Sequence, residues 1–389
     1  MCILLSRKQA ARFWRRWSLA MAFLLIGMGL GNQPAQAGTS PGIVTIDVAL
    51  QPTLLAIDPH THQIYVRTLG ITDHYGSPGQ GAGYTLLDGT TGKVRHVWPD
   101  TDTGGYPPVY FTRTDNGLRA SLPSHPRAGY TPPPALEIML TQVGAQITTG
   151  VVDEVADQQG GLVALVTVPL SQAAHPVTYT LWIFNAKTAH VIAATKVQKQ
   201  DVALAFDPAA NRVLVAFPNS VQLFTLSGLH YLATIATQGY QEAHSLLYNG
   251  YNQPNRLYDS EPLAVDMSMG RAVAISGVNG KGTAQIIDMK SGRVLHTVSV
   301  GIQPINVQVD TTLHRAYILD TGSCEVNILD LRSEKLVANV AVGLTPLGLA
   351  VDEPTGKVFV TQPGGHVILF PADTTLHQSG CYPPYPSVQ

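Results

Sequence analysis

The chain repeats one arrangement of apolar and polar positions from near its beginning to near its end. The stretch "VGIQPINVQVDTTLHRAYILD" (300–320) is followed by "VGLTPLGLAVDEPTGKVFVTQ" (342–362), and "VALQPTLLAIDPHTHQIYVRT" (48–68) has the same pattern. In each copy an alternating apolar run ends in Asp, a polar turn follows, and a second apolar run begins. This pattern predicts two β-strands joined by a tight turn.

A second strand pair follows the first in most copies. Its turns begin with Asp or Asn and have Gly or another small residue a few positions later, as in "YTLLDGTTGKVRHVW" and "AQIIDMKSGRVLHTV". Asx side chains hydrogen-bond the backbone of their own turn, and Gly accepts the positive φ that a tight hairpin requires. Each repeat is therefore predicted to hold four short antiparallel strands, called A to D below.

The second strand pairs recur at a regular spacing. Their turns begin at Asp88, about Leu140, Asn185, about Thr225, Asp288, Asp330 and about Pro371. Four strands per unit at a period of roughly 40 to 50 residues are typical of propeller blades, so we predict an all-β fold, a seven-bladed β-propeller of four-stranded antiparallel blades. The copies at 136–150 and 365–375 are the poorest, which leaves six or eight blades as alternatives.

The last repeat has three good strands and little strand signal after them. The segment "IVTIDVAL" (43–50) matches the outer strand that precedes other repeats, such as "VLHTVSV" before "GIQP". We expect this N-terminal strand to complete the last blade and close the ring, because closure removes the open edges of an unpaired sheet.

The segments "IYVRT", "AYILD" and "KVFVT", with the Asp-containing turns around them, resemble the repeats of the YVTN-repeat β-propeller family. The resemblance covers most of 43–375 and is weakest in the second repeat. It implies the propeller fold. It implies little about activity, because propellers carry many unrelated functions.

The first 37 residues have the order of a secretory signal peptide. Five basic residues precede the apolar run "SLAMAFLLIGMGLG" (18–31), and "AQA" (35–37) offers small residues for cleavage. We therefore divide the chain into a signal peptide (1–37), a propeller (38–375) and a C-terminal tail (376–389), and predict a periplasmic or secreted protein. An uncleaved anchor is the alternative, although the run is short for a membrane span.

Charge and cysteine content narrow the expected partners. Without the signal segment 19 basic residues stand against 26 acidic ones, a net charge of about −7, so we expect no nucleic-acid partner. Cys324 and Cys381 remain, and an even number of cysteines in an oxidising compartment predicts one disulfide. We expect no cofactor, no transmembrane segment after signal removal, and a monomer.

Long connections are predicted on one face only. In a four-stranded blade the B–C and D–A loops share a face, and the inserts at 70–83, 99–110, 123–135, 169–176 and 237–262 all fall in such loops. Long loops on a rigid scaffold mark a binding face. The expected ligand- or partner-binding residues are His74, Tyr75, His125, Arg127, His175, Tyr240, His244, Tyr251 and Arg256. The alternative is that such residues merely fill surface loops.

A catalytic function has less support. No pair of the loop histidines has metal-ligand spacing, so we expect no metal site there. Glu154, Asp201 and Glu261 are expected to precede the innermost strands of the third, fourth and fifth repeats. They resemble the acids around the axis of calcium-dependent propeller lactonases; solvated carboxylates are the simpler interpretation. The sequence favours a non-catalytic binding protein, with a metal-dependent hydrolase that uses these three acids as the alternative. A quinoprotein-like redox subunit is disfavoured because CxxCH is absent.

Overall fold

The computed structural model describes residues 42–58, 60–69, 82–99, 110–114, 117–121, 149–156, 161–169, 179–185, 188, 190–197, 203–237, 248–249, 253–254, 261–277, 280–381 and 387–388. These residues belong to one unit of the chain, Ser40–Gln389. Within them every regular element is a β-strand, and they include no helix with the length and apolarity needed to cross a membrane. The expected signal peptide lies outside the described residues.

Six sheets contain four antiparallel strands each. Sheet 1 is β2 (Pro52–Asp58), β3 (Gln63–Thr68), β4 (Gly83–Asp88) and β5 (Val94–Pro99); sheet 2 is β8 (Thr149–Ala156), β9 (Leu162–Pro169), β10 (Tyr179–Asn185) and β11 (Val191–Val197). Sheet 3 is β12 (Ala203–Asp207), β13 (Arg212–Phe217), β14 (Ser220–Thr225) and β15 (Tyr231–Ala236); sheet 4 is β18 (Leu263–Asp266), β19 (Arg271–Ser276), β20 (Lys281–Asp288) and β21 (Arg293–Ile302). Sheet 5 is β22 (Pro304–Asp310), β23 (Arg315–Asp320), β24 (Glu325–Asp330) and β25 (Lys335–Ala341).

Sheet 6 draws its strands from the two ends of the repeat region. It contains β26 (Leu349–Asp352), β27 (Lys357–Gln362), β28 (His366–Pro371) and β1 (Val44–Asp47). The N-terminal β1 pairs antiparallel with β28, with Val44 opposite Leu369. The short β29 (Ser387–Val388) then pairs parallel with the far edge of β1. The N-terminal strand therefore pairs with the last repeat, as its sequence pattern predicts.

The second predicted repeat is described only as a hairpin, β6 (Tyr110–Thr114) and β7 (Gly117–Ser121). Single parallel residue pairs connect it to the neighbouring sheets: Ile57 with Arg119, and Thr114 with Ala156. The turn expected near Leu140 lies outside the described residues. Another two-stranded hairpin, β16 (Tyr248–Asn249) and β17 (Gln253–Pro254), belongs to the long connection between sheets 3 and 4.

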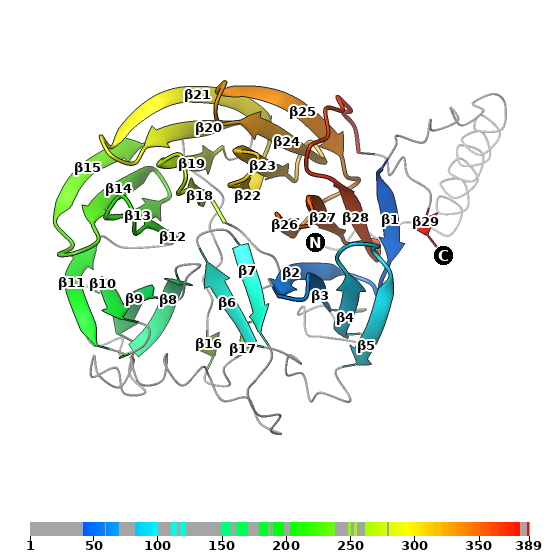
Figure 1. Ribbon diagram of the computed structural model, residues 1–389, viewed down its shortest axis with the longest axis horizontal. Coiled ribbons are helices and arrows are strands. Elements are labelled where there is room, and N and C mark those ends of the chain that lie inside the picture. The colour runs from blue at the N-terminus through cyan, green and yellow to red at the C-terminus, as the bar shows by residue number, and fades with distance from the viewer. Residues whose placement is uncertain are drawn as a thin grey trace, which may run out of the picture. The chain divides into compact units, whose positions relative to one another are not determined.

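The sheets follow one another with their first strands innermost and their fourth strands outermost (Figure 1). The inner strands are neighbours in chain order from β8 through β12, β18, β22 and β26, and β26 in turn contacts β2. Burial follows the same direction: every residue of β2 and β22 is buried, whereas β5 is almost entirely exposed. The inner strands are continuous apolar runs because neighbouring sheets cover both of their faces.

Five hydrophobic clusters are each shared by two consecutive sheets, and a sixth, which includes Leu54 and Tyr65, lies within sheet 1. One cluster joins sheets 5 and 6 through residues such as Tyr317 and Phe370, and another joins sheets 6 and 1 through Phe359 and Ile64. Equivalent clusters join sheets 2 and 3, sheets 3 and 4, and sheets 4 and 5. The repeat thus buries its apolar surface only when its neighbours are present, which is typical of repeat architectures.

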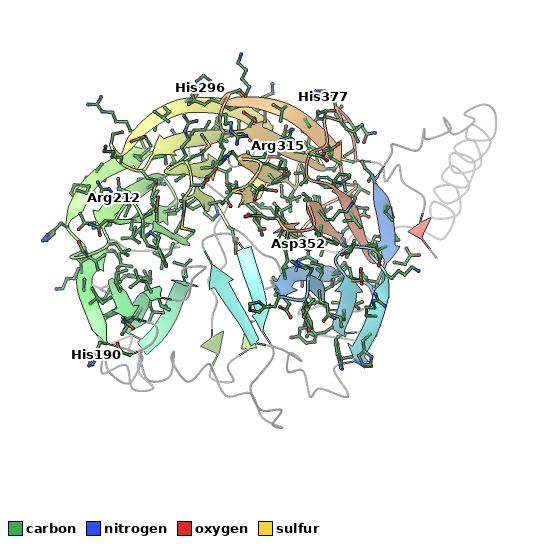
Figure 2. All side chains as sticks on the ribbon, viewed as in Figure 1. His190, Arg212, His296, Arg315, Asp352 and His377 are labelled. Atoms are coloured by element: carbon green, nitrogen blue, oxygen red, sulfur yellow. A yellow bond between two sulfur atoms is a disulfide. The ribbon has the colours of Figure 1, made fainter. Side chains whose placement is uncertain are left out.

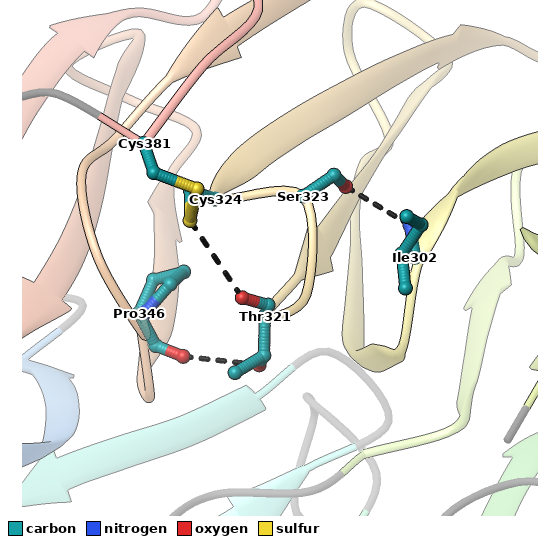
Figure 3. Close-up of a disulfide and its surroundings, with 6 residues drawn as sticks. All are labelled: Ile302, Thr321, Ser323, Cys324, Pro346 and Cys381. Carbon is teal, nitrogen blue, oxygen red and sulfur yellow. Dashed lines mark hydrogen bonds between the residues drawn. A yellow bond between two sulfur atoms is a disulfide. The ribbon is translucent and has the colours of Figure 1, made fainter. Parts of the chain in front are cut away.

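The segment after β28 returns along the outside of sheet 5. Leu376 and Gln378 make backbone hydrogen bonds of 2.8 and 2.9 Å with Asn339 of β25. Three residues later Cys381 forms a disulfide with Cys324. Figure 3 shows this disulfide beside the turn between β23 and β24. The predicted disulfide between the two cysteines is confirmed.

Candidate binding face

The two ends of the sheets differ in the length of their connections. All A–B turns of the six sheets and the C–D turns of sheets 1 to 5 are short, as in 58–63 and 330–335. The longer connections meet the six sheets at the opposite end, after β3, β5, β9 and β15 and before β8. We call the end with these connections the loop end and the other the turn end. The predicted asymmetry is confirmed where a connection meets one of the six sheets.

The turn end is held by local hydrogen bonds. The carboxylate of Asp88 accepts backbone hydrogen bonds from Thr90 and Thr91, and Asp330 accepts one from Ser333 at 2.6 Å. A hydrogen bond from Arg95, then those from Thr91, lower the pKa of Asp88 below its usual range. These bonds explain why the repeat keeps Asp or Asn at this position: the side chain closes the turn.

Arginines at the start of three B strands connect neighbouring sheets near the turn end. Arg212 donates through Nε to the carbonyl of Met289 at 3.1 Å, and Arg315 donates through Nη1 to the carbonyl of Ala372 at 3.0 Å. Arg271 makes the equivalent bond to Leu331. Their guanidinium groups therefore bond neighbouring sheets to each other.

A serine, a histidine and an aspartate also meet at the turn end. His314 Nδ1 lies 2.7 Å from Asp266 Oδ2, and Ser268 Oγ lies 3.3 Å from the same Nδ1 and 2.6 Å from Asp266 Oδ1. A catalytic triad requires the serine and the aspartate to contact different ring nitrogens. Here both contacts fall on Nδ1, so the trio joins sheets 4 and 5 and does not activate a nucleophile.

The residues expected to bind a ligand or partner lie in the long connections. His74, Tyr75, His125, Arg127, His175, Tyr240, His244, Tyr251 and Arg256 are all outside the described residues. Their role as a binding surface stays a prediction.

The structure describes two of the three acids of the alternative cation site. Contrary to the expectation, Glu154 lies within β8 and not before it, and its backbone pairs with Leu165; Asp201 is outside the described residues. Glu261 is 2 % exposed and its backbone is bonded to Ile305 and Val307 of the next inner strand. Glu261 is therefore buried at the loop end and is not the solvated carboxylate of the simpler interpretation. Whether the three acids converge stays a prediction.

A buried polar network at the loop end of sheet 5 was not predicted. Asn327 Nδ2 donates to Asp320 Oδ2 at 2.7 Å and to Glu325 Oε1 at 3.2 Å. Asn339 Nδ2 continues the network with bonds to Glu325 Oε2 and to the carbonyl of Gln378. The network crosses β23, β24 and β25 and ends on the C-terminal segment that the disulfide holds.

Asp320 is the most deeply buried acid of this network. It is 0 % exposed, and burial raises the pKa of its carboxyl well above the usual range, with the charge of Glu325 acting in the same direction. A hydrogen bond from Asn327 opposes the rise. The only sequence signal is an acid that ends a buried B strand, where equivalent repeats have Thr68, Ser276 or Gln362. That signal is too small to reveal the network.

The base of the 70–81 connection is anchored by sheet 1. Arg67 Nη1 and Thr68 Oγ1 both donate to the carbonyl of Gly83 at 3.2 Å. The Arg67 guanidinium also lies 4.7 Å from the ring centre of Tyr84, a cation–π contact. These contacts fix the two strand ends from which the connection leaves and so give it a rigid support.

No protein-family model matches the chain, and no curated protein matches it. Within the described part of the chain, no group of three or more His, Cys, Asp or Glu side chains is arranged to hold a metal ion.

Proposed function

We propose that the protein is an exported, seven-bladed β-propeller of the YVTN-repeat type that binds a partner or ligand through its loop end. β1 is the strand that closes the ring, and β6 and β7 belong to the second blade. The observation that carries the binding function is the difference between the two ends. At the turn end the connections are short and side chains such as Arg212 and Arg315 bond neighbouring sheets, whereas the longer connections of the six sheets meet them at the loop end.

Export is supported by two independent features. Residues 1–37 have the charge and apolar pattern of a secretory signal. The Cys324–Cys381 disulfide is of a kind that persists in oxidising compartments.

The test compares alanine substitutions at the two ends. The loop-end variant carries Tyr240→Ala, His244→Ala and Tyr251→Ala; the control carries His190→Ala and His230→Ala, exposed residues of C–D turns. Partners are captured on the purified protein from the periplasmic or extracellular fraction of the source cells and measured by mass spectrometry. We expect the loop-end variant to lose a partner that the control retains. Equal retention by both, or equal loss, would contradict the proposal.

Glu261 favours one second candidate, a metal-dependent hydrolase. Its carboxyl is buried at the loop end of an inner strand, where a ligand to an axial cation would lie. The test is elemental analysis of protein purified without chelator, beside a Glu154→Ala, Asp201→Ala, Glu261→Ala variant. A stoichiometric metal that the variant loses would favour the hydrolase over the binding protein.

A further inference from the structure

The A–B turns contain a repeated aspartate, and in sheets 4 and 6 its two carboxylate oxygens make different contacts: one bonds within the turn and the other contacts the following sheet. In sheet 4, Asp266 Oδ1 accepts from the backbone of Met269 and from Ser268 Oγ, so this oxygen closes its own turn. Asp266 Oδ2 contacts Nδ1 of His314, which comes from the following sheet. In sheet 6, Asp352 likewise contacts His62 of sheet 1 at 3.2 Å, and its other oxygen accepts from Thr355 at 2.7 Å.

Two equivalent carboxylates have only the first of these contacts. Asp207 Oδ1 accepts from the backbone of Ala210, and Asp310 Oδ1 accepts from the backbone of Thr312 and Leu313. Oδ2 of each residue is buried and has no hydrogen-bond partner among the described residues. Both side chains are 1 % exposed, so bulk water does not compensate for the missing bond.

The sequence explains why these two oxygens differ from the others. The third residue after the Asp is Ala210 or Leu313, where Asp58 and Asp352 have a threonine whose hydroxyl donates to them. The position of His314 and His62 is taken in the following sheets by Gly270 and Gly356. The donor is therefore missing from both sides of each oxygen.

The glycines keep the backbone of the histidines but leave the side-chain space open. Gly270 and Gly356 have φ of +62°, close to the +55° of His62 and the +56° of His314. A Cβ built on either glycine meets no heavy atom within 4 Å. We call the pair Asp310 and Gly356 the first notch, and the pair Asp207 and Gly270 the second notch.

We propose that these two notches bind a compact protonated nitrogen base of the imidazole class, supplied from outside the chain. The imidazole of His314 shows which group the same backbone accepts in the filled junction: a flat ring that presents one N–H to the carboxylate. Charged groups surround Asp310 at the first notch, and the positive charges of His314 and Arg315 lower its pKa against the effect of burial. Glu353 accepts a hydrogen bond from Thr311 at 2.8 Å beside Asp310, while the nearby Arg315 guanidinium donates to the carbonyls of Ala372 and Thr374.

Electrostatics favours a cation over a neutral molecule in this place. Burial raises the pKa of Asp310, because its charged form lacks sufficient compensation. A bound cation that donates a hydrogen bond would supply that compensation, and charge-assisted hydrogen bonds are stronger than neutral ones. This binding site lies at the turn end, so it is separate from the proposed partner surface at the loop end and does not depend on it.

The test is a titration of the full-length protein with imidazolium chloride at a pH of about 6, followed by thermal unfolding, with sodium chloride as the salt control. A ligand that binds only the folded state raises Tm in a saturable way. At about ten times Kd we expect a rise of about 2–4 °C. The Asp207→Asn, Asp310→Asn double variant should lose the rise. The Gly270→His, Gly356→His double variant should unfold at a higher temperature without imidazole and not respond to it.

A third variant calibrates the size of the response. His314→Gly opens a notch of the same geometry opposite Asp266, and imidazole should restore part of the lost Tm; His62→Gly serves if that protein does not fold. A response of the native protein that equals that of the Asp207→Asn, Asp310→Asn variant would overturn the proposal. Titration with N-acetylhistidine methylamide separates the sources: a matching rise points to a histidine side chain of a partner, and a rise with imidazole alone points to a small free base.

Discussion

His314 Nδ1 lies 2.7 Å from Oδ2 of the buried Asp266, which is 48 residues earlier in the chain and belongs to the preceding sheet. The contact joins sheets 4 and 5 at the turn end. His314→Ala leaves that carboxylate oxygen without its donor, which costs about 1–3 kcal/mol of the free energy of unfolding. Denaturant unfolding of the two proteins measures the loss.

His296→Ala is the matched control for this prediction. His296 is exposed on the outer strand β21, on the rim in Figure 2, and surface substitutions of this kind usually change stability by no more than about 0.5 kcal/mol. Equal stability of the His314 and His296 variants would show that the inter-sheet contact contributes nothing.

The disulfide should stabilise the fold by fixing the C-terminal segment on sheet 5. It joins residues 57 positions apart, and a loop of this length is expected to contribute about 2–4 kcal/mol by constraining the unfolded chain. Replacing both cysteines by serine should lower the free energy of unfolding by that amount. Hydrogen exchange should become faster at Asn339 and Gln378, whose backbone bond depends on the segment. Free thiols in the secreted protein would contradict this account.

Gly301 should tolerate no side chain. A Cβ at this position would lie 2.1 Å from Ser323 Oγ and 2.7 Å from Asp320 Cγ, so Gly301→Ala must displace the turn beside the disulfide. We expect a loss of about 1–3 kcal/mol, the usual cost of overpacking. Gly280→Ala is the control, because a Cβ there meets nothing within 4 Å; its unfolding free energy should stay the same or rise. Equal losses in the two variants would contradict the steric explanation.

Asp320 should make the protein less stable as the pH rises. Its pKa in the folded state is raised by burial above the unfolded value of 3.8. The folded state therefore binds the Asp320 proton more tightly than the unfolded state does. The resulting stabilisation is fully present below the unfolded pKa and is lost as the pH rises through the folded pKa. Asp320→Asn removes the buried charge and should stabilise the protein at pH 7 by about 1 kcal/mol or more, because one pKa unit corresponds to about 1.4 kcal/mol.

The measurement for Asp320 is the free energy of unfolding from acid to neutral pH. The Asp320→Asn variant should show a flatter decline toward neutral pH than the native protein. Asp88→Asn is the opposite control, since the pKa of Asp88 is lowered by Arg95 and the turn and its contribution is lost as the pH falls. Parallel curves for the native protein and the Asp320 variant would mean that Asp320 carries no buried charge.

Much of the strand order could be predicted because the repeat is local. The C strands end at Asp88, Asn185, Thr225, Asp288 and Asp330, at the positions that the turn pattern indicates, since an Asx side chain closes a hairpin without help from distant residues. The pairing of 43–50 with the last repeat followed from matching one outer strand to another. The second repeat has the weakest pattern, and only β6 and β7 represent it among the described strands.

The contacts between sheets could not be read from the pattern. Nothing in "VDTTLHR" says that His314 meets Asp266, or that Asp320 and Glu325 share the amide of Asn327. These contacts depend on how far one sheet is rotated and displaced against the next, and local turn chemistry does not specify that. The sequence by itself determined the strands, the short turns, the end that carries the long connections and the cysteine pair. The first three depend on local periodicity, and the last follows from the number of cysteines outside the signal segment. Only the tertiary structure decided which buried carboxylates have a partner, since a partner across a sheet junction is a matter of distance between residues far apart in the chain.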